Sequence, residues 1–152
     1  MTSKAVIMVG GSSRGTRFRP LALDEAKILF PIAGKPLLAH TIDAVLKIES
    51  ITEILLIGFY EPSVFTEFIS AFNAKMKYQR RNCSIKYLKE FKALGTAGGL
   101  YFFREEIMKG NPDNFLVIHG DIVCEFPLSE IIDFYEAKKE LSKEKLDAVL
   151  FD

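Results

Sequence analysis

Four short segments with strand patterns constrain the fold of this chain more than any other feature. They lie at residues 5–9, 53–59, 84–88 and 115–118, and three of them contain a continuous apolar run. Segments with apolar side chains at helical spacing separate or follow them, at 36–48, 62–77, after Thr96 and at 128–141. Strands and helices that alternate in this way predict an α/β fold with a Rossmann-like, doubly wound and mostly parallel sheet. A further strand is predicted at 147–151.

A glycine-rich turn follows the first apolar run. Gly10, Gly11 and Gly15 allow the backbone to turn sharply and leave its N–H groups open to a ligand. The cations Arg17 and Lys27 follow soon after. The turn alone is also compatible with a purely structural role. The clustered cations favour a phosphate site, because backbone amides and fixed positive charge together stabilise oxyanions.

Two common phosphate-binding motifs do not fit this turn. Gly10 and Gly15 have the spacing of a P-loop, but Thr16-Arg17 stand where that motif needs Lys and then Ser or Thr. The dinucleotide fingerprint needs a residue between its first two glycines, and here Gly10 and Gly11 are adjacent. The turn is therefore expected to bind phosphates in some other way.

Two more segments with binding character leave the carboxyl ends of predicted strands. Gly95 and Thr96 could wrap a base edge at a helix start, or Thr96 could be an ordinary N-cap. Asp121 follows the fourth strand, where a lone carboxylate suits Mg²⁺ and is equally typical of a turn. Because ligands of such sheets bind at the carboxyl ends of the strands, these segments and the glycine turn should converge.

Composition excludes several other classes. The 152 residues suffice for one domain, and a net charge of zero gives no broad basic field for nucleic acid or an anionic membrane. No apolar run approaches the roughly 20 residues that span a bilayer. Cys83 and Cys124 match no metal or redox spacing, and two reduced cysteines suit a cytoplasmic protein.

The glycine turn resembles the signature of the sugar-1-phosphate nucleotidyltransferases. The matching residues are Gly10-Gly11, Gly15-Thr16-Arg17, Pro20-Leu21 and Lys27, followed by the block at 30–36. Within that family the chain is similar to the alpha-type, regulatory-like subunit of GDP-mannose pyrophosphorylase. The shared features are the longer glycine loop and the strings at 54–60 and 94–101.

This resemblance implies a reaction in which a sugar-1-phosphate attacks the α-phosphorus of GTP and pyrophosphate leaves. It implies Mg²⁺ as cofactor, GTP or GDP-mannose as ligand, and a catalytic beta-type subunit as partner. By resemblance, the residues with catalytic roles are Arg17 and Lys27, those that bind the nucleotide are Gly10, Gly11, Gly15, Thr16, Glu90, Gly95 and Thr96, and the metal ligand is Asp121.

The chain departs from the active pattern in ways that favour a regulatory role. The glycine loop is longer than in the catalytic type, and Ala26 and Ile28 replace the prolines beside Lys27. Residues 1–152 correspond to the nucleotide-binding part, and the family's sugar-binding half and C-terminal β-helix are expected to be absent. Three hypotheses remain open: a regulatory subunit, the nucleotide-binding half of an active guanylyltransferase, and a non-catalytic fragment. We expect the isolated chain to be inactive.

Overall fold

The computed structural model of the chain describes residues 2–11, 18, 20–21, 26–141 and 148. These residues fall into two units, Met1–Ile122 and Val123–Asp152. The second unit contains helix α5, Leu128–Leu141, over the residues predicted. The strand predicted at 147–151 lies, apart from Ala148, outside the described residues.

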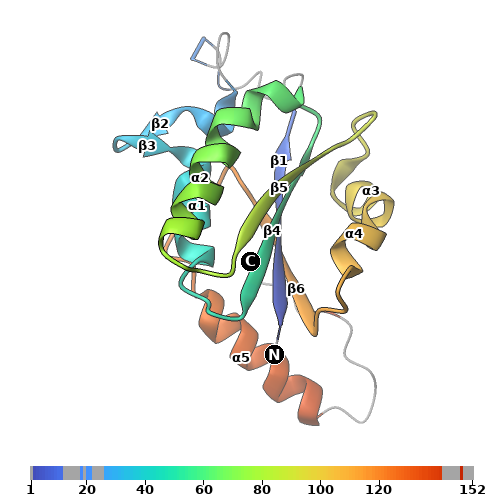
Figure 1. Ribbon diagram of the computed structural model, residues 1–152. Helices are drawn as coiled ribbons and strands as arrows, with labels where there is room; N and C mark the ends of the chain where they lie inside the picture. Colours follow the sequence, from blue (N-terminus) through green and yellow to red (C-terminus); the bar gives the residue numbers. More distant parts are fainter. Residues whose placement is uncertain (1, 12–17, 19, 22–25, 142–147, 149–152) are drawn as a thin grey trace. The chain divides into compact units, whose positions relative to one another are not determined.

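A four-stranded parallel sheet is the centre of the first unit (Figure 1). Its order is β5-β4-β1-β6. The strands are β1 Ser3–Gly10, β4 Ile51–Gly58, β5 Ser84–Lys89 and β6 Asn114–His119. The chain runs outward from β1 to β4 and β5, then returns to the other side of β1 to form β6. This change of direction confirms the doubly wound prediction, and it places a topological switch point between β1 and β6.

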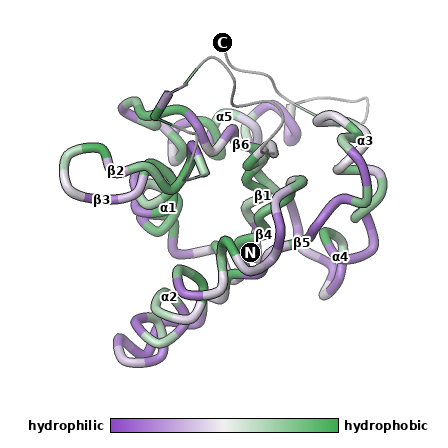
Figure 2. The backbone as a smooth tube through the Cα atoms, turned by 90° about the horizontal axis from the view of Figure 1, so that it is seen from above, coloured by the Kyte–Doolittle hydropathy of each residue, from purple (hydrophilic) through white to green (hydrophobic). Residues whose placement is uncertain are grey.

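Helices cover both faces of this sheet, as Figures 1 and 2 show. On one side lie α1 Leu37–Val45 and α2 Thr66–Tyr78, which a short 3₁₀ turn, Pro62–Phe65, precedes. On the other lie α3 Gly95–Phe102 and α4 Arg104–Met108, where a single helix had been expected. A 3₁₀ turn, Lys27–Leu29, and a hairpin of β2 Pro31–Ile32 and β3 Lys35–Pro36 lead into α1.

The two central strands are buried on both faces. Residues Ala5 to Ile7 of β1 and Ile54 to Ile57 of β4 are 0% exposed. This explains their continuous apolar runs, since a parallel strand covered by helices on both sides has no polar face. The apolar run at 115–118 likewise predicts a buried strand, but β6 differs from that prediction. It is at the edge of the sheet among the described residues, and Phe115 and Val117 are 40% and 41% exposed.

A charged cluster closes the amino edge of the sheet. The Lys4 ammonium lies 2.7 Å from Glu53 Oε2 and donates to the Glu106 carbonyl at 2.9 Å. Lys86 also pairs with the Glu53 carboxylate. Burial raises the pKa of Glu53, but the hydrogen bonds from both lysines outweigh it, and its pKa lies below the usual range. None of the predicted site residues that the structure describes belongs to this edge.

Candidate nucleotide-binding site

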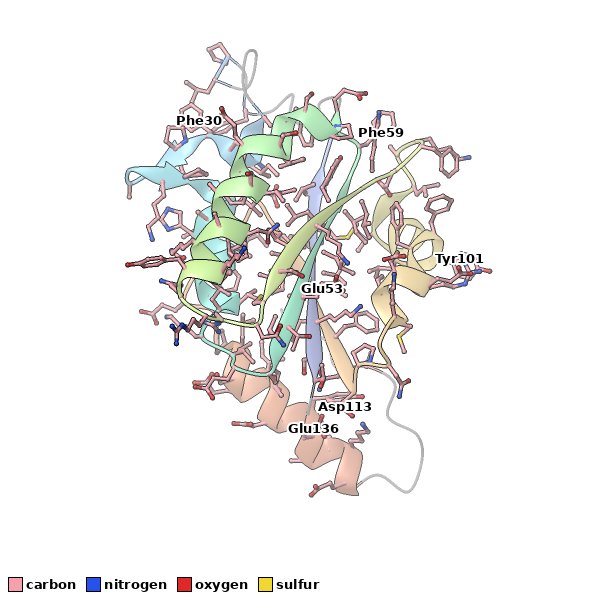
Figure 3. The ribbon with its side chains drawn as sticks, viewed as in Figure 1. Phe30, Glu53, Phe59, Tyr101, Asp113 and Glu136 are labelled. Atoms are coloured by element: carbon pink, nitrogen blue, oxygen red, sulfur yellow. The ribbon has the colours of Figure 1, made fainter. Side chains whose placement is uncertain are left out.

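A cavity of about 600 Å³ opens at the carboxyl edge of the sheet. Figure 3 shows Phe59, which lines it, at this edge and Asp113 at the opposite one. Seven of the ten predicted site residues line the cavity: Gly10, Gly11, Lys27, Glu90, Gly95, Thr96 and Asp121. The other three, Gly15, Thr16 and Arg17, lie outside the described residues. The expected convergence of the strand ends is therefore observed wherever the structure describes the residues.

The start of the glycine turn is fixed by a close approach between two strands. Gly10 has a φ of +72°, which glycine adopts without steric cost, and its carbonyl accepts the Phe59 N–H at 2.7 Å. A Cβ at Gly58 would collide with the Gly10 carbonyl oxygen and lie 2.6 Å from Val9 Cγ2. The glycine at the end of β4 thus lets the turn of β1 lie against it.

The Glu90 carboxylate is held at one end of the cavity. The Glu90 N–H extends the sheet by donating to the Gly58 carbonyl at 2.7 Å, and the residue is 5% exposed. A Cβ at Gly99 of α3 would lie 2.8 Å from Glu90 Oε1. The absence of a side chain at Gly99 therefore leaves the space that the carboxylate occupies beside the helix.

Helix α3 begins at this same end of the cavity. Its first residue, Gly95, has a φ of +77°, and Leu94 rather than Thr96 is the N-cap residue. The alternative in which Thr96 caps the helix is wrong, because the left-handed turn at Gly95 places Thr96 within the first helical turn. Thr96 instead lines the cavity.

Lys27 and Asp121 form an ion pair in the cavity. Lys27 Nζ lies 2.6 Å from Asp121 Oδ2, and the two residues are 94 positions apart in the chain. The hydrogen bond from Lys27 holds the pKa of Asp121 below its usual range, although burial raises it. Asp121 is therefore an ionised carboxylate at neutral pH.

Two tyrosines that the sequence did not single out support this site. The Tyr87 hydroxyl accepts the Tyr60 N–H and donates to the Tyr60 carbonyl, both at 2.8 Å. Burial raises the pKa of Tyr87 to about 12 and also raises that of Tyr60, which lines the cavity. Tyr87 thus satisfies both backbone groups of the residue that follows β4. Such a contact depends on how β4 and β5 are aligned, and no local pattern in the sequence encodes it.

His119 is another cavity residue that the sequence analysis did not single out. It is the last residue of β6, it pairs in register with Met8, and its exposed side chain lines the cavity two residues before Asp121. The signal that could have identified it is its position at a strand end, next to a predicted ligand-binding residue.

The side chains that could coordinate a metal ion decide whether one fits in this cavity. Within the part of the chain that the structure describes, no three His, Cys, Asp or Glu side chains are grouped so that they could hold a metal ion. Mg²⁺ keeps several waters and often takes only one or two carboxylates together with substrate phosphates. Asp121 therefore fits a magnesium ion that arrives with a phosphorylated ligand, and it does not form a metal site by itself.

Comparison with known proteins identifies the family. The family model described as Nucleotidyl transferase matches residues 4–146. The chain belongs to this nucleotidyltransferase family. The resemblance seen in the glycine turn is confirmed, and so is the similarity to the alpha-type subunit.

Two curated relatives carry the name "Mannose-1-phosphate guanylyltransferase regulatory subunit alpha". The one from Dictyostelium discoideum is 51% identical over 135 residues, which are 89% of this chain and 32% of the relative. The one from Drosophila melanogaster is 50% identical over 135 residues, 89% of this chain and 30% of the relative. The chain thus spans about a third of the length of these relatives.

Solved structures support the fold. A UDP-glucose pyrophosphorylase complexed with UDP-glucose superimposes with a TM-score of 0.66 at 19% identity, covering 91% of this chain and 55% of that chain. At that identity the likeness extends to the fold and not to the ligand. None of the described helices has the length and apolar character needed to cross a bilayer.

Proposed function

We propose that this domain binds GTP or GDP-mannose, as the nucleotide-binding part of a regulatory subunit of mannose-1-phosphate guanylyltransferase. The observation that carries the proposal is that one cavity brings Lys27, Glu90 and Asp121 together. Its volume of about 600 Å³ is typical of small-molecule sites. The names of the relatives point to the same nucleotide-sugar chemistry, and hence to GDP-mannose biosynthesis.

The order of the strands gives the ligand an orientation. Glu90 follows β5 and Asp121 follows β6, and these strands lie at opposite edges of the sheet, three strand spacings apart. At about 4.8 Å per spacing, this separates the two carboxylates by roughly 14 Å, a distance that an extended nucleotide can bridge. We place the base beside Glu90, Gly95 and Thr96, and the phosphates near Gly10, Gly11 and Lys27.

The chemistry of Glu90 favours guanine over adenine. An ionised carboxylate only accepts hydrogen bonds, and guanine presents two neighbouring donors, its N1–H and its amino group. Adenine presents an acceptor at N1. Glu90 is buried, so a base that cannot donate to its carboxyl oxygens leaves a buried polar group poorly partnered, which is costly.

A magnesium ion bound with the nucleotide would be held by Asp121. The ion would neutralise the charge of the phosphates, while the chain's own residues position them: the Gly10–Gly11 backbone from one side and Lys27 from another. Arg17 is proposed to bind the departing phosphates in a catalytic relative, and here to contribute to affinity. Gly15 and Thr16 are proposed to donate backbone or hydroxyl groups to the same phosphates.

The differences between this sequence and the active pattern of the family favour a regulatory role over catalysis. They are the longer glycine loop and the replacement of the prolines beside Lys27. The glycine loop is longer than in the catalytic type, so more conformers must be ordered before its amides point at a ligand. We propose a catalytic beta-type subunit as the partner and the cytoplasm as the compartment, which the free cysteines Cys83 and Cys124 suit. Binding of the partner is tested by co-purification, and a soluble chain with no affinity for that subunit contradicts it.

Calorimetric titration of the chain with GTP and GDP-mannose in the presence of Mg²⁺ tests the nucleotide proposal. Arg17→Ala should weaken binding by about 1–3 kcal/mol, because a charge-assisted contact to phosphate is lost. Arg104→Ala is the matched control, since the guanidinium of this α4 residue donates to the Tyr101 carbonyl, and neither residue lines the cavity. Absence of saturable binding by the unaltered chain would reject the proposal.

A further inference from the structure

The Lys27–Asp121 ion pair has a consequence for how the site takes up its ligand. Both side chains are partly exposed to the cavity, 30% for Lys27 and 42% for Asp121, so a ligand can reach them. The pair is nonetheless short, 2.6 Å between Nζ and Oδ2. The lysine therefore occupies one of the two carboxylate oxygens that Asp121 could offer to a divalent cation.

An ammonium and a divalent cation cannot share this oxygen closely, since both are positive. A free cation must displace Lys27 and leave the ammonium without its partner. A cation that arrives with a nucleotide brings phosphate oxygens, and these offer Lys27 a new anionic partner. The lysine can make the exchange because its ammonium is a compact charge with three donors on a flexible stem.

We propose that Lys27 makes this site selective for a metal–nucleotide complex over the free metal ion, by occupying Asp121 until ligand phosphates accept its ammonium. The nucleotide half of this inference rests on the proposed function. The metal half rests only on the ion pair, so the two can be tested separately.

A second ion pair of the chain provides a matched control. Lys35 Nζ lies 2.6 Å from Asp43 Oδ2, the same distance as in the cavity pair. Its side chains are 50% and 44% exposed, and neither residue lines the cavity. Removing the Lys35 charge frees a carboxylate that has no cavity around it, so it reports what the loss of any exposed ion pair does to metal binding.

The experiment titrates Mn²⁺ alone into the full chain and measures free Mn²⁺ by electron paramagnetic resonance. We expect Lys27→Met to raise the Mn²⁺ affinity about tenfold, because a competing and repelling charge is gone. Lys35→Met should behave like the unaltered chain. The gain should disappear in the double variant Lys27→Met/Asp121→Asn, which assigns it to Asp121. Circular dichroism checks that each variant is folded.

A second titration uses GTP with Mg²⁺. Lys27→Met should weaken this binding about tenfold even though it strengthens binding of the free metal, since the phosphates lose their cation. Unchanged or lower Mn²⁺ affinity in folded Lys27→Met overturns the inference, and so does a gain that survives Asp121→Asn. If the unaltered chain fails to bind GTP, the proposed nucleotide function is wrong. The Mn²⁺ titration still decides whether Lys27 competes with a metal ion for Asp121.

Discussion

The contact between Gly58 and the glycine turn gives a prediction that can be worked from the structure. In Gly58→Ala the new Cβ would collide with the Gly10 carbonyl oxygen, and it would lie 2.6 Å from Val9 Cγ2 and 3.3 Å from the Gly10 N atom. Two of these three atoms are backbone of β1, which is paired on both sides, to β4 and to β6. They cannot rotate away as the end of a flexible side chain can.

We therefore expect Gly58→Ala to cost about 3 kcal/mol of unfolding free energy, the upper end of the range for overpacking in a well-packed interior. The assay is urea unfolding followed by circular dichroism. The control is Gly110→Ala, where φ is +81° and the added Cβ meets nothing within 4 Å. That variant should cost only the left-handed penalty, about 1–2 kcal/mol. If Gly58→Ala is no more destabilising than Gly110→Ala, the argument from the close approach is wrong.

Three further predictions concern the supporting contacts and the activity of the chain. Tyr87→Phe should cost about 1–3 kcal/mol in urea unfolding, because both backbone groups of Tyr60 lose their partner, while Tyr101→Phe at a 71% exposed position should be neutral. Since the folded pKa of Glu53 lies below its unfolded value, its stabilisation is present above about pH 4.5 and is lost as the pH falls through the folded pKa. Glu53→Gln should therefore flatten the acid limb of the stability–pH curve. Supplied with GTP, mannose-1-phosphate and Mg²⁺, the isolated chain should release no pyrophosphate above background. Turnover requires both reactants to be held in place, which contributes up to roughly 7–11 kcal/mol of barrier lowering. We expect a regulatory domain that binds the nucleotide alone not to supply this contribution. Robust release that Asp121→Ala abolishes would contradict this.

The sequence was sufficient for the sheet because its central strands are buried on both faces. Continuous apolar runs at 5–9 and 54–57 therefore identified β1 and β4, and the helix predicted from Leu128 to about Leu141 was found with its start at Leu128. The position of β6 was also predicted, but its exposure was not. The exposure of Phe115 depends on which elements cover the edge of the sheet. Local patterns cannot supply that information.

The candidate site was predictable in its location and less so in its contacts. The rule that ligands bind at the carboxyl ends of parallel strands brought Gly10, Glu90 and Asp121 together correctly. The Lys27–Asp121 pair joins residues 94 positions apart, and the Tyr87 contact joins a residue within β5 to one that follows β4. Both depend on strand register, which a single sequence leaves unspecified.

The two histidines of the chain allow the most direct test of nucleotide binding in this cavity. His119 lines the cavity, whereas His40 is hydrogen-bonded to the Ile32 carbonyl and does not line it. Histidine ring signals would be recorded by nuclear magnetic resonance while GTP with Mg²⁺ is added. The account predicts a saturable shift of the His119 signals and a much smaller change at His40. Saturable GTP binding that leaves His119 unmoved would place the nucleotide elsewhere and contradict the account.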